Sequence, residues 1–228
     1  GQPVLVQAGG SEDGRALAAE TAEMIYSVQG SLEEGRAFYA DVKNRMAAWN
    51  REPHELLVMP GLYTVVGRTR GEADDKHGAL SALTDPAVSL AMLRFCLGGH
   101  DLGGYDPDGP VPQDLTTEGG TTHLALMLRI ARENDYTLRR LAEEVAVGGY
   151  GHWSLRGTPV EIADAMQERF EAGAADGFNL MPATYPGGLR DFCDLVLPEL
   201  RRRGLFRHEY EGRTLRDHLG LRRAAISC

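Results

Sequence analysis

Cysteine is scarce in this sequence, and its spacing excludes two common uses of the residue. The chain has 228 residues and three cysteines, Cys96, Cys193 and Cys228. Their odd number and wide separation predict neither a disulfide framework nor a zinc-binding CxxC pair. Cys96 and Cys193 lie in apolar helical patterns, so we expect both in the hydrophobic core. The seven histidines lack the HExxH spacing, and no metal site is expected.

The sequence also lacks an excess of positive charge and any long apolar run. Its 24 basic and 33 acidic residues give a net charge of -9. Nucleic acids and anionic membranes need a basic face that displaces counterions, so neither is expected as a partner. No apolar run approaches the roughly 20 residues that span a bilayer, and no signal peptide pattern opens the chain. We expect a cytoplasmic protein. Because the chain begins with Gly1 rather than Met, processing or a longer parent protein is an open possibility.

The residues that are abundant predict one globular α/β domain over 1–228. Hydrophobic residues make up 43% of the chain and charged residues 25%, which suits a chain that buries a substantial core. Apolar runs predict strands at 4–6, 24–28, 56–66 and 178–181, with a bulge or bend at Pro60-Gly61. Helical patterns follow them, opened by Ser11, by the capping box of Ser31 and Glu34, and by the Thr158–Glu161 box. This alternation predicts a parallel sheet with helices outside it.

A long insertion separates the third and fourth predicted strands. Helical patterns at 72–83 and 86–97 lead into residues 98–150, which form a loop and helical insertion. Residues 98–120 are rich in glycine, proline and aspartate, a composition typical of a functional lid or a disordered segment. Helices are expected at 122–132 and 137–147. Four parallel strands alone would leave open edges and an uncovered apolar layer, so we expect a missing first half or a homo-oligomer partner to close the sheet.

The turn Gln7-Ala8-Gly9-Gly10-Ser11 is the candidate binding site. It lies between the end of a strand and the start of a helix, where unpaired backbone N–H groups and the helix dipole favour an anion such as phosphate. The glycines permit close approach of the backbone, and Ser11 can add a hydroxyl donor. Glycine followed by an N-cap serine is also how an ordinary strand-to-helix turn is built, so the pattern alone leaves both interpretations open.

Five segments resemble the nitrilotriacetate monooxygenase component A family of bacterial-luciferase-like enzymes: residues 3–9, 157–164, 173–182, 198–206 and 210–216. The resemblance covers almost the whole chain. It implies the second half, about four strand-helix units, of a luciferase-like (β/α)8 TIM barrel with a helical insertion before the last strand. It also implies that Gln7, Ala8, Gly9 and Ser11 match the family's flavin-phosphate turn, with Gly10 at the position that varies.

The resemblance implies an FMNH2-dependent two-component monooxygenase. A separate NAD(P)H:FMN reductase would supply FMNH2, and a flavin C4a-hydroperoxide would oxidise a small organic substrate. The family's catalytic histidine region is absent, so catalytic residues stay unassigned and this segment alone is expected to be inactive. The alternative is an inactive half-barrel that acts as a flavin-binding or assembly partner. An aldolase or isomerase barrel would need a lysine or paired carboxylates at the strand ends, which the predicted strands lack.

Overall fold

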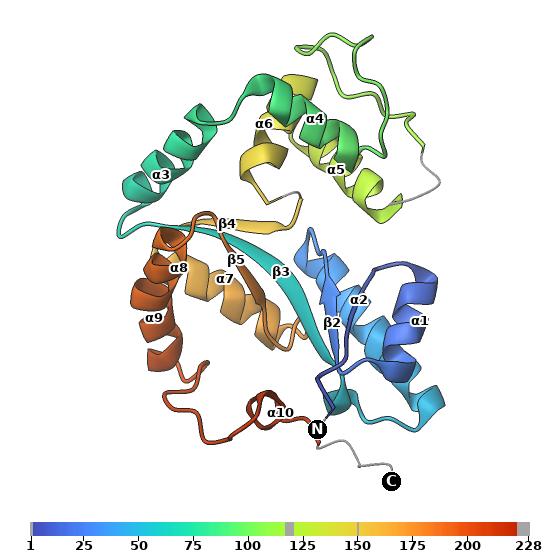
Figure 1. Cartoon of the computed structure of the whole chain (residues 1–228), viewed down its shortest axis with the longest axis vertical. Helices are drawn as coiled ribbons and strands as arrows, with labels where there is room; N and C mark the ends of the chain where they lie inside the picture. Colours follow the sequence, from blue (N-terminus) through green and yellow to red (C-terminus); the bar gives the residue numbers. More distant parts are fainter. Residues whose placement is uncertain (1, 117–120, 150, 223–228) are drawn as a thin grey trace.

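A computed structural model describes residues 2–116, 121–149 and 151–222, and it shows an α/β fold with a parallel sheet (Figure 1). The five strands are β1 (Val6–Ala8), β2 (Met24–Ser27), β3 (Leu57–Val66), β4 (Trp153–Gly157) and β5 (Asn179–Pro182). The helices are α1 (Glu12–Thr21), α2 (Leu32–Arg45), α3 (Arg70–Ala82), α4 (Pro86–Cys96), α5 (Thr121–Glu133), α6 (Leu138–Val147), α7 (Pro159–Glu171), α8 (Gly187–Asp191), α9 (Leu197–Arg202) and α10 (Leu215–His218).

The long strand β3 organises the sheet. Residues 57–60 pair with β2, which in turn pairs with β1. Residues 62–66 pair with β4, and residues 61–64 pair with β5. Every pairing is parallel, which confirms the expected parallel sheet. A bulge or bend is expected at Pro60-Gly61; β3 continues through these residues as one strand and changes neighbours there. The sequence interpretation also missed β4, a strand of five residues that is too short and too polar to show an apolar run.

Hydroxyl side chains begin the helices where the sequence predicts them. Ser11 caps α1 by accepting from the backbone N–H of Gly14 at 3.2 Å. Ser31 and Glu34 form the expected capping box at the start of α2. Thr158 and Glu161 do the same for α7, which also has proline in its first turn. Each cap satisfies backbone donors that have no carbonyl partner within the helix.

One face of the sheet is buried against helices. Ile25 and Val58 form a cluster with residues of α1 and α2. Leu62 and Val66 form a second cluster with residues of α7, α9 and the segment 192–196. Because strand side chains alternate, the next residues along each strand belong to the opposite face. That face is the one on which the candidate site is built.

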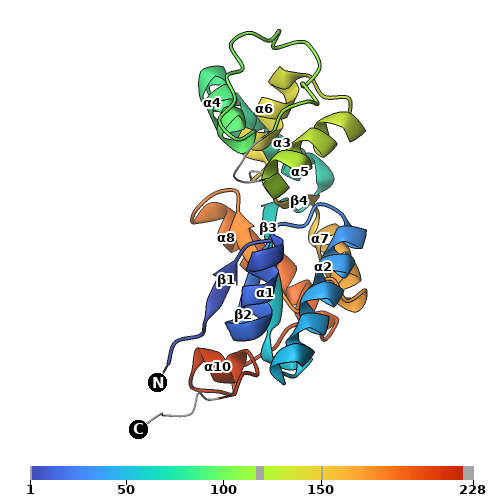
Figure 2. The same ribbon diagram turned by 90° about the vertical axis from the view of Figure 1, so that its right-hand side faces the viewer.

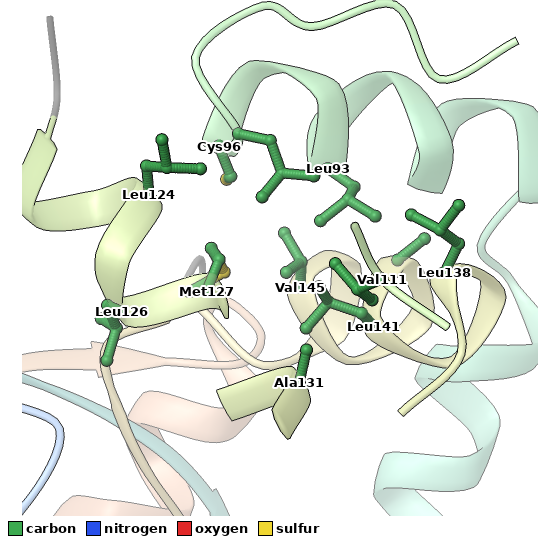
Figure 3. Close-up of a cluster of buried hydrophobic side chains, with 12 residues drawn as sticks. Leu93, Cys96, Val111, Leu124, Leu126, Met127, Ala131, Leu138, Leu141 and Val145 are labelled. Carbon is green, nitrogen blue, oxygen red and sulfur yellow. The ribbon is translucent and has the colours of Figure 1, made fainter. Parts of the chain in front are cut away.

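A third hydrophobic cluster lies in a helical unit at one end of the molecule (Figures 1 and 2). Helices α4, α5 and α6 direct leucine, valine and methionine side chains toward one another, with Met127 of α5 completely buried (Figure 3). The expected helices at 122–132 and 137–147 are confirmed as α5 and α6. The described part of the loop between α4 and α5 is fastened to α6 by an ion pair of 2.7 Å between Asp108 and Arg139.

Helices α8 and α9 are joined by a π-helical turn over Phe192–Val196. Pro198 lies just beyond this turn. Proline has no backbone N–H group to donate to a carbonyl of the preceding turn. The wider π-helical turn shifts the hydrogen-bonding register just ahead of this missing donor. Cys96 is buried as expected, whereas the prediction for Cys193 is wrong because this residue is exposed at the turn. Cys228 lies outside the described residues.

Within the described residues, no single helix is both long and apolar enough to span a bilayer. Helices α3 and α4 reach that length and apolar composition only when they are taken together, and the chain bends by 95° between them.

Candidate functional site

The predicted phosphate turn lies at the carboxyl end of β1, beside the next strand. Ala8 pairs with Tyr26 of β2, and Tyr26 pairs with Met59 of β3. Neighbouring strands are about 4.8 Å apart, so Tyr26 is one strand away from the residue that precedes Gly9. The turn is accessible: Ala8, Gly10 and Ser11 are exposed, while Gln7 and Gly9 are half-buried.

The backbone of this turn depends on its glycines. Gly9 has a φ of 151°, a conformation that favours glycine. A Cβ on Gly14 would lie 3.1 Å from Oγ of Ser11 and 3.3 Å from the carbonyl oxygen of Gly9, so the first turn of α1 approaches the loop closely. The Ser11 hydroxyl already accepts a hydrogen bond from Gly14, and its own proton is left to donate to a ligand.

The charges around the turn are arranged so that an anion can approach it. The N-terminus of α1 presents backbone N–H groups and the positive end of the helix dipole. Glu12 lies in this first turn, but its carboxylate is bound by Arg45 at 2.6 Å and by Arg15 at 2.9 Å. The hydrogen bond from Arg45 lowers the pKa of Glu12, although burial opposes that shift. The two arginines therefore neutralise Glu12, one of the two acidic residues of this turn; the other is Asp13.

Gln7 adds an unsatisfied acceptor next to the turn. Its Oε1 atom is buried and receives no hydrogen bond from the described residues. The carboxamide lies near Gly9, since a Cβ built on that glycine would be 3.5 Å from Nε2 of Gln7. A buried acceptor without a donor is costly, and this one lies on the helix-covered face, since Gln7 pairs with Ile25. The structure thus brings Gln7, Gly9 and Ser11 together in one turn.

The face of the sheet opposite the helices carries a second group of residues. Tyr26, Met59, Tyr63 and Met181 occupy alternate strand positions there, and each is half-buried. The Tyr26 hydroxyl donates to Sδ of Met181 at 3.4 Å. It also lies 3.2 Å from Nδ1 and 3.1 Å from Nε2 of His152. Burial raises the pKa values of both Tyr26 and Tyr63, so their hydroxyls stay protonated at neutral pH.

Glycines make room for the contact between Tyr26 and His152. A Cβ on Gly61 of β3 would lie 2.6 Å from the Tyr26 hydroxyl and 2.8 Å from Nδ1 of His152. In the segment before His152, Gly149 has a φ of 72° and Gly151 a φ of 81°. A Cβ on Gly149 would approach the Tyr63 ring to 2.9 Å, and the chain can cross this ring closely only because the side chain is missing.

His152 also borders a cavity of about 440 Å³ between the strands and the helical unit. The cavity is lined by aromatic, apolar and charged side chains from β3, β4, α3, α5 and α6, among them Tyr63, His77, Met127, Arg140, Ser154 and Arg156. Burial, together with the charge of Arg156, lowers the pKa of His77. No group of three or more His, Cys, Asp or Glu residues within the described ranges is placed to hold a metal ion.

Comparison with known proteins identifies the family. The family model described as luciferase-like monooxygenase matches residues 1–176. The chain belongs to the luciferase-like monooxygenases. It is 46% identical over 224 residues to nitrilotriacetate monooxygenase component A of Aminobacter aminovorans, covering 98% of this chain and 49% of that protein. It is 43% identical over 224 residues to N-acetyl-S-(2-succino)cysteine monooxygenase of Bacillus subtilis, covering 97% of this chain and 50% of the relative. The family resemblance stated from the sequence is confirmed.

Solved structures agree with this assignment. DmoA from Hyphomicrobium sulfonivorans matches with a TM-score of 0.81 and 30% identity, over 95% of this chain and 45% of DmoA. A riboflavin lyase solved with modified FMN and the substrate riboflavin matches with a TM-score of 0.79 and 31% identity, over 96% of this chain and 47% of the lyase. The chain therefore spans about half the length of the relatives that it matches.

The sequence interpretation found the turn but missed the pair on the open face. His152 directly precedes strand β4, which the sequence interpretation did not predict. Nothing in the sequence connects Tyr26 to a histidine 126 positions later. The available signals were the glycines before His152 and Gly61 within an otherwise apolar strand, because such glycines mark a close approach of backbone or side chains.

Proposed function

We propose that this chain acts in an FMNH2-dependent two-component monooxygenase that oxidises a small organic substrate in the cytoplasm. A separate NAD(P)H:FMN reductase supplies the reduced flavin. The observation that carries the proposal is the turn Gln7–Ser11, an accessible turn between the carboxyl end of a strand and the N-terminus of α1, in a chain that belongs to the luciferase-like monooxygenases. Catalytic sites of parallel barrels lie at the carboxyl ends of the strands.

The residues of the turn fit the phosphate end of FMN. Backbone N–H groups at the start of α1 and the Ser11 hydroxyl would donate to phosphate oxygens. Gly9 keeps the backbone close to the ligand. The bound flavin supplies the oxygen chemistry. The protein's own groups bind the phosphate, orient the ring and exclude water from it.

We further propose that the sheet is half of a (β/α)8 barrel. Two observations support this proposal: the chain spans about half the length of its relatives, and one face of the sheet keeps partly exposed apolar residues. Val6 of edge strand β1 is 58% exposed. A closed barrel would cover this face and remove the open edge of β1. The closing partner is the other half of a longer chain or a second polypeptide.

The substrate class is inferred from the relatives. The name of one relative refers to nitrilotriacetate, and that of another to a succinated cysteine. Both are small and carry several carboxylates. Arg140 and Arg156 line the cavity beside His152, where an anionic substrate would have to compete with their ion pairs to Glu144 and Asp74.

The test mixes FMN that has been chemically reduced with O2 in a stopped-flow spectrophotometer, with and without the protein as it is produced from its gene. We expect the protein to change the time course of flavin reoxidation even before a substrate is known. Candidate polycarboxylates are then added with labelled O2, NAD(P)H and a reductase, and product must require the reductase. Unchanged reoxidation of the flavin would contradict the proposal.

A further inference from the structure

The pair formed by Tyr26 and His152 lies between the phosphate turn and the cavity. Tyr26 is the neighbour of Ala8 across strands β1 and β2, and Ala8 directly precedes the turn. On the other side, His152 borders the cavity under α5 and α6. The pair is therefore one strand away from the turn on one side and at the border of the cavity on the other.

The chain is built to hold His152 in this place. The imidazole comes from a segment whose glycines at 149 and 151 have positive φ values, and it contacts Tyr26 above the missing side chain of Gly61. The two rings meet edge-on, with centroids 5.6 Å apart and planes inclined by 64°. Glycines at 61, 149 and 151 therefore all contribute to the contact between Tyr26 and His152.

The hydrogen-bonding pattern assigns a role to each residue. The Tyr26 hydroxyl donates to Sδ of Met181 at 3.4 Å and lies within hydrogen-bonding distance of both ring nitrogens of His152, 3.2 Å from Nδ1 and 3.1 Å from Nε2. This contact restricts the rotation of the imidazole. His152 is half-buried and borders the cavity.

We propose that His152 binds the polar edge of the flavin ring, whose carbonyl and ring N–H groups need donors and acceptors, and that Tyr26 is a positioning residue that orients the imidazole. This inference rests on the proposed function and deepens it, because it assigns a second flavin contact besides the phosphate turn. The cavity beyond the pair is then the place for the substrate.

The test compares the affinities for FMN and for riboflavin, which has the same ring but no phosphate, by quenching of flavin fluorescence. The protein is used as it is produced from its gene. Loss of one hydrogen bond to the ring should weaken both flavins alike, by about fivefold to tenfold for His152→Ala. His152→Gln, which keeps a donor and an acceptor, should recover most of the affinity. Tyr26→Phe should cause a smaller loss with the same ratio between the two flavins. His54→Ala, at an exposed histidine in the short helix Pro53–Glu55, serves as the matched control.

The outcomes separate this inference from the proposed function. If the unaltered protein binds neither flavin, the proposed function itself fails. If it binds FMN and the His152 variants keep both affinities within twofold, the flavin contact of His152 is refuted while the phosphate turn stands. A loss confined to FMN would also overturn the inference, because it would make His152 a phosphate ligand. Circular dichroism melting checks that each variant is folded. If His152→Ala is unfolded, His152→Gln takes its place in the comparison.

Discussion

The hydroxyl of Tyr26 lies 3.1 Å from Nε2 of His152, although 126 residues separate the two in the chain. The contact joins strand β2 to the segment that leads from the helical unit into β4. Its geometry depends on Gly61, which contributes no side chain to the space that the two rings occupy. The arrangement gives the open face of the sheet a fixed polar group beside the phosphate turn.

Gly61→Ala should displace this pair. The added Cβ would lie 2.6 Å from the Tyr26 hydroxyl and 2.8 Å from His152, so one of the rings must move. We expect FMN to bind about fivefold more weakly and the free energy of unfolding to fall by about 1–2 kcal/mol. Fluorescence titration and urea unfolding measure the two effects. Gly78→Ala in α3 is the control, since no other atom lies within 4 Å of its Cβ, and it should leave FMN binding unchanged.

Asp176→Ala should destabilise the protein strongly. The Asp176 carboxylate binds Lys43 at 2.9 Å, the N–H of Val58 at 2.8 Å and the Tyr39 hydroxyl at 2.9 Å. Its removal leaves the buried ammonium group of Lys43 without a counter-charge, which costs about 3 kcal/mol. Urea unfolding tests this value. Arg139→Ala, which breaks the exposed pair with Asp108, should leave the midpoint of unfolding nearly unchanged. Equal effects of the two substitutions would refute the buried network.

Tyr39 should make stability fall at high pH. Burial, the negative charge of Asp176 and the hydrogen bond to it raise the pKa of Tyr39 from 10.0 to about 12. The folded state therefore disfavours tyrosinate, so this contribution to stability is complete below about pH 10 and is lost as the pH rises toward 12. Unfolding free energies of the unaltered protein and of Tyr39→Phe, measured across this range, should converge at its upper end. Parallel curves would contradict the assignment.

Arg169→Lys should be destabilising although it keeps the positive charge. The guanidinium group of Arg169 lies over the Trp153 ring, with Cζ 4.0 Å from the ring centroid. It also donates to Gln29 at 3.3 Å and to the carbonyl of Gly30 at 3.2 Å. Lysine cannot stack in this way and donate to both, so we expect a loss of about 1–2 kcal/mol. Urea unfolding followed by tryptophan fluorescence measures the loss. An unchanged unfolding midpoint would mean that the stacking contributes nothing to stability.

The features that could be predicted from the sequence were local ones. The caps at Ser11, Ser31 and Thr158 are encoded within four residues of each helix start, and all three are present. The parallel sheet followed from the alternation of apolar runs with helical patterns. The phosphate turn is likewise continuous in sequence, and its residues are brought together as the pattern suggested, although its role in flavin binding stays a prediction.

The features that could not be predicted depend on distant segments. Strand β4 carries Ser154 and Arg156 on its exposed face and shows no apolar run, and it becomes a strand because β3 offers it a partner. The contact of Tyr26 with His152 forms only because the chain that leaves the helical unit passes close to Tyr63 on its way to β4. Cys193 lies in an apolar pattern but is exposed, because the π-helical turn before Pro198 shifts the faces of the helix that an α-helical repeat would assign.

The central claim is that Ser11 and its turn hold the flavin phosphate, and the FMN affinity of Ser11→Glu tests it most directly. The new carboxylate fills the turn and repels the phosphate, so we predict that FMN binds at least about tenfold more weakly while riboflavin affinity changes little. Ser31→Glu, at the N-cap of the next strand-helix unit, controls for the loss of a helix cap and should leave both affinities intact. FMN binding to Ser11→Glu with unchanged affinity would contradict the account.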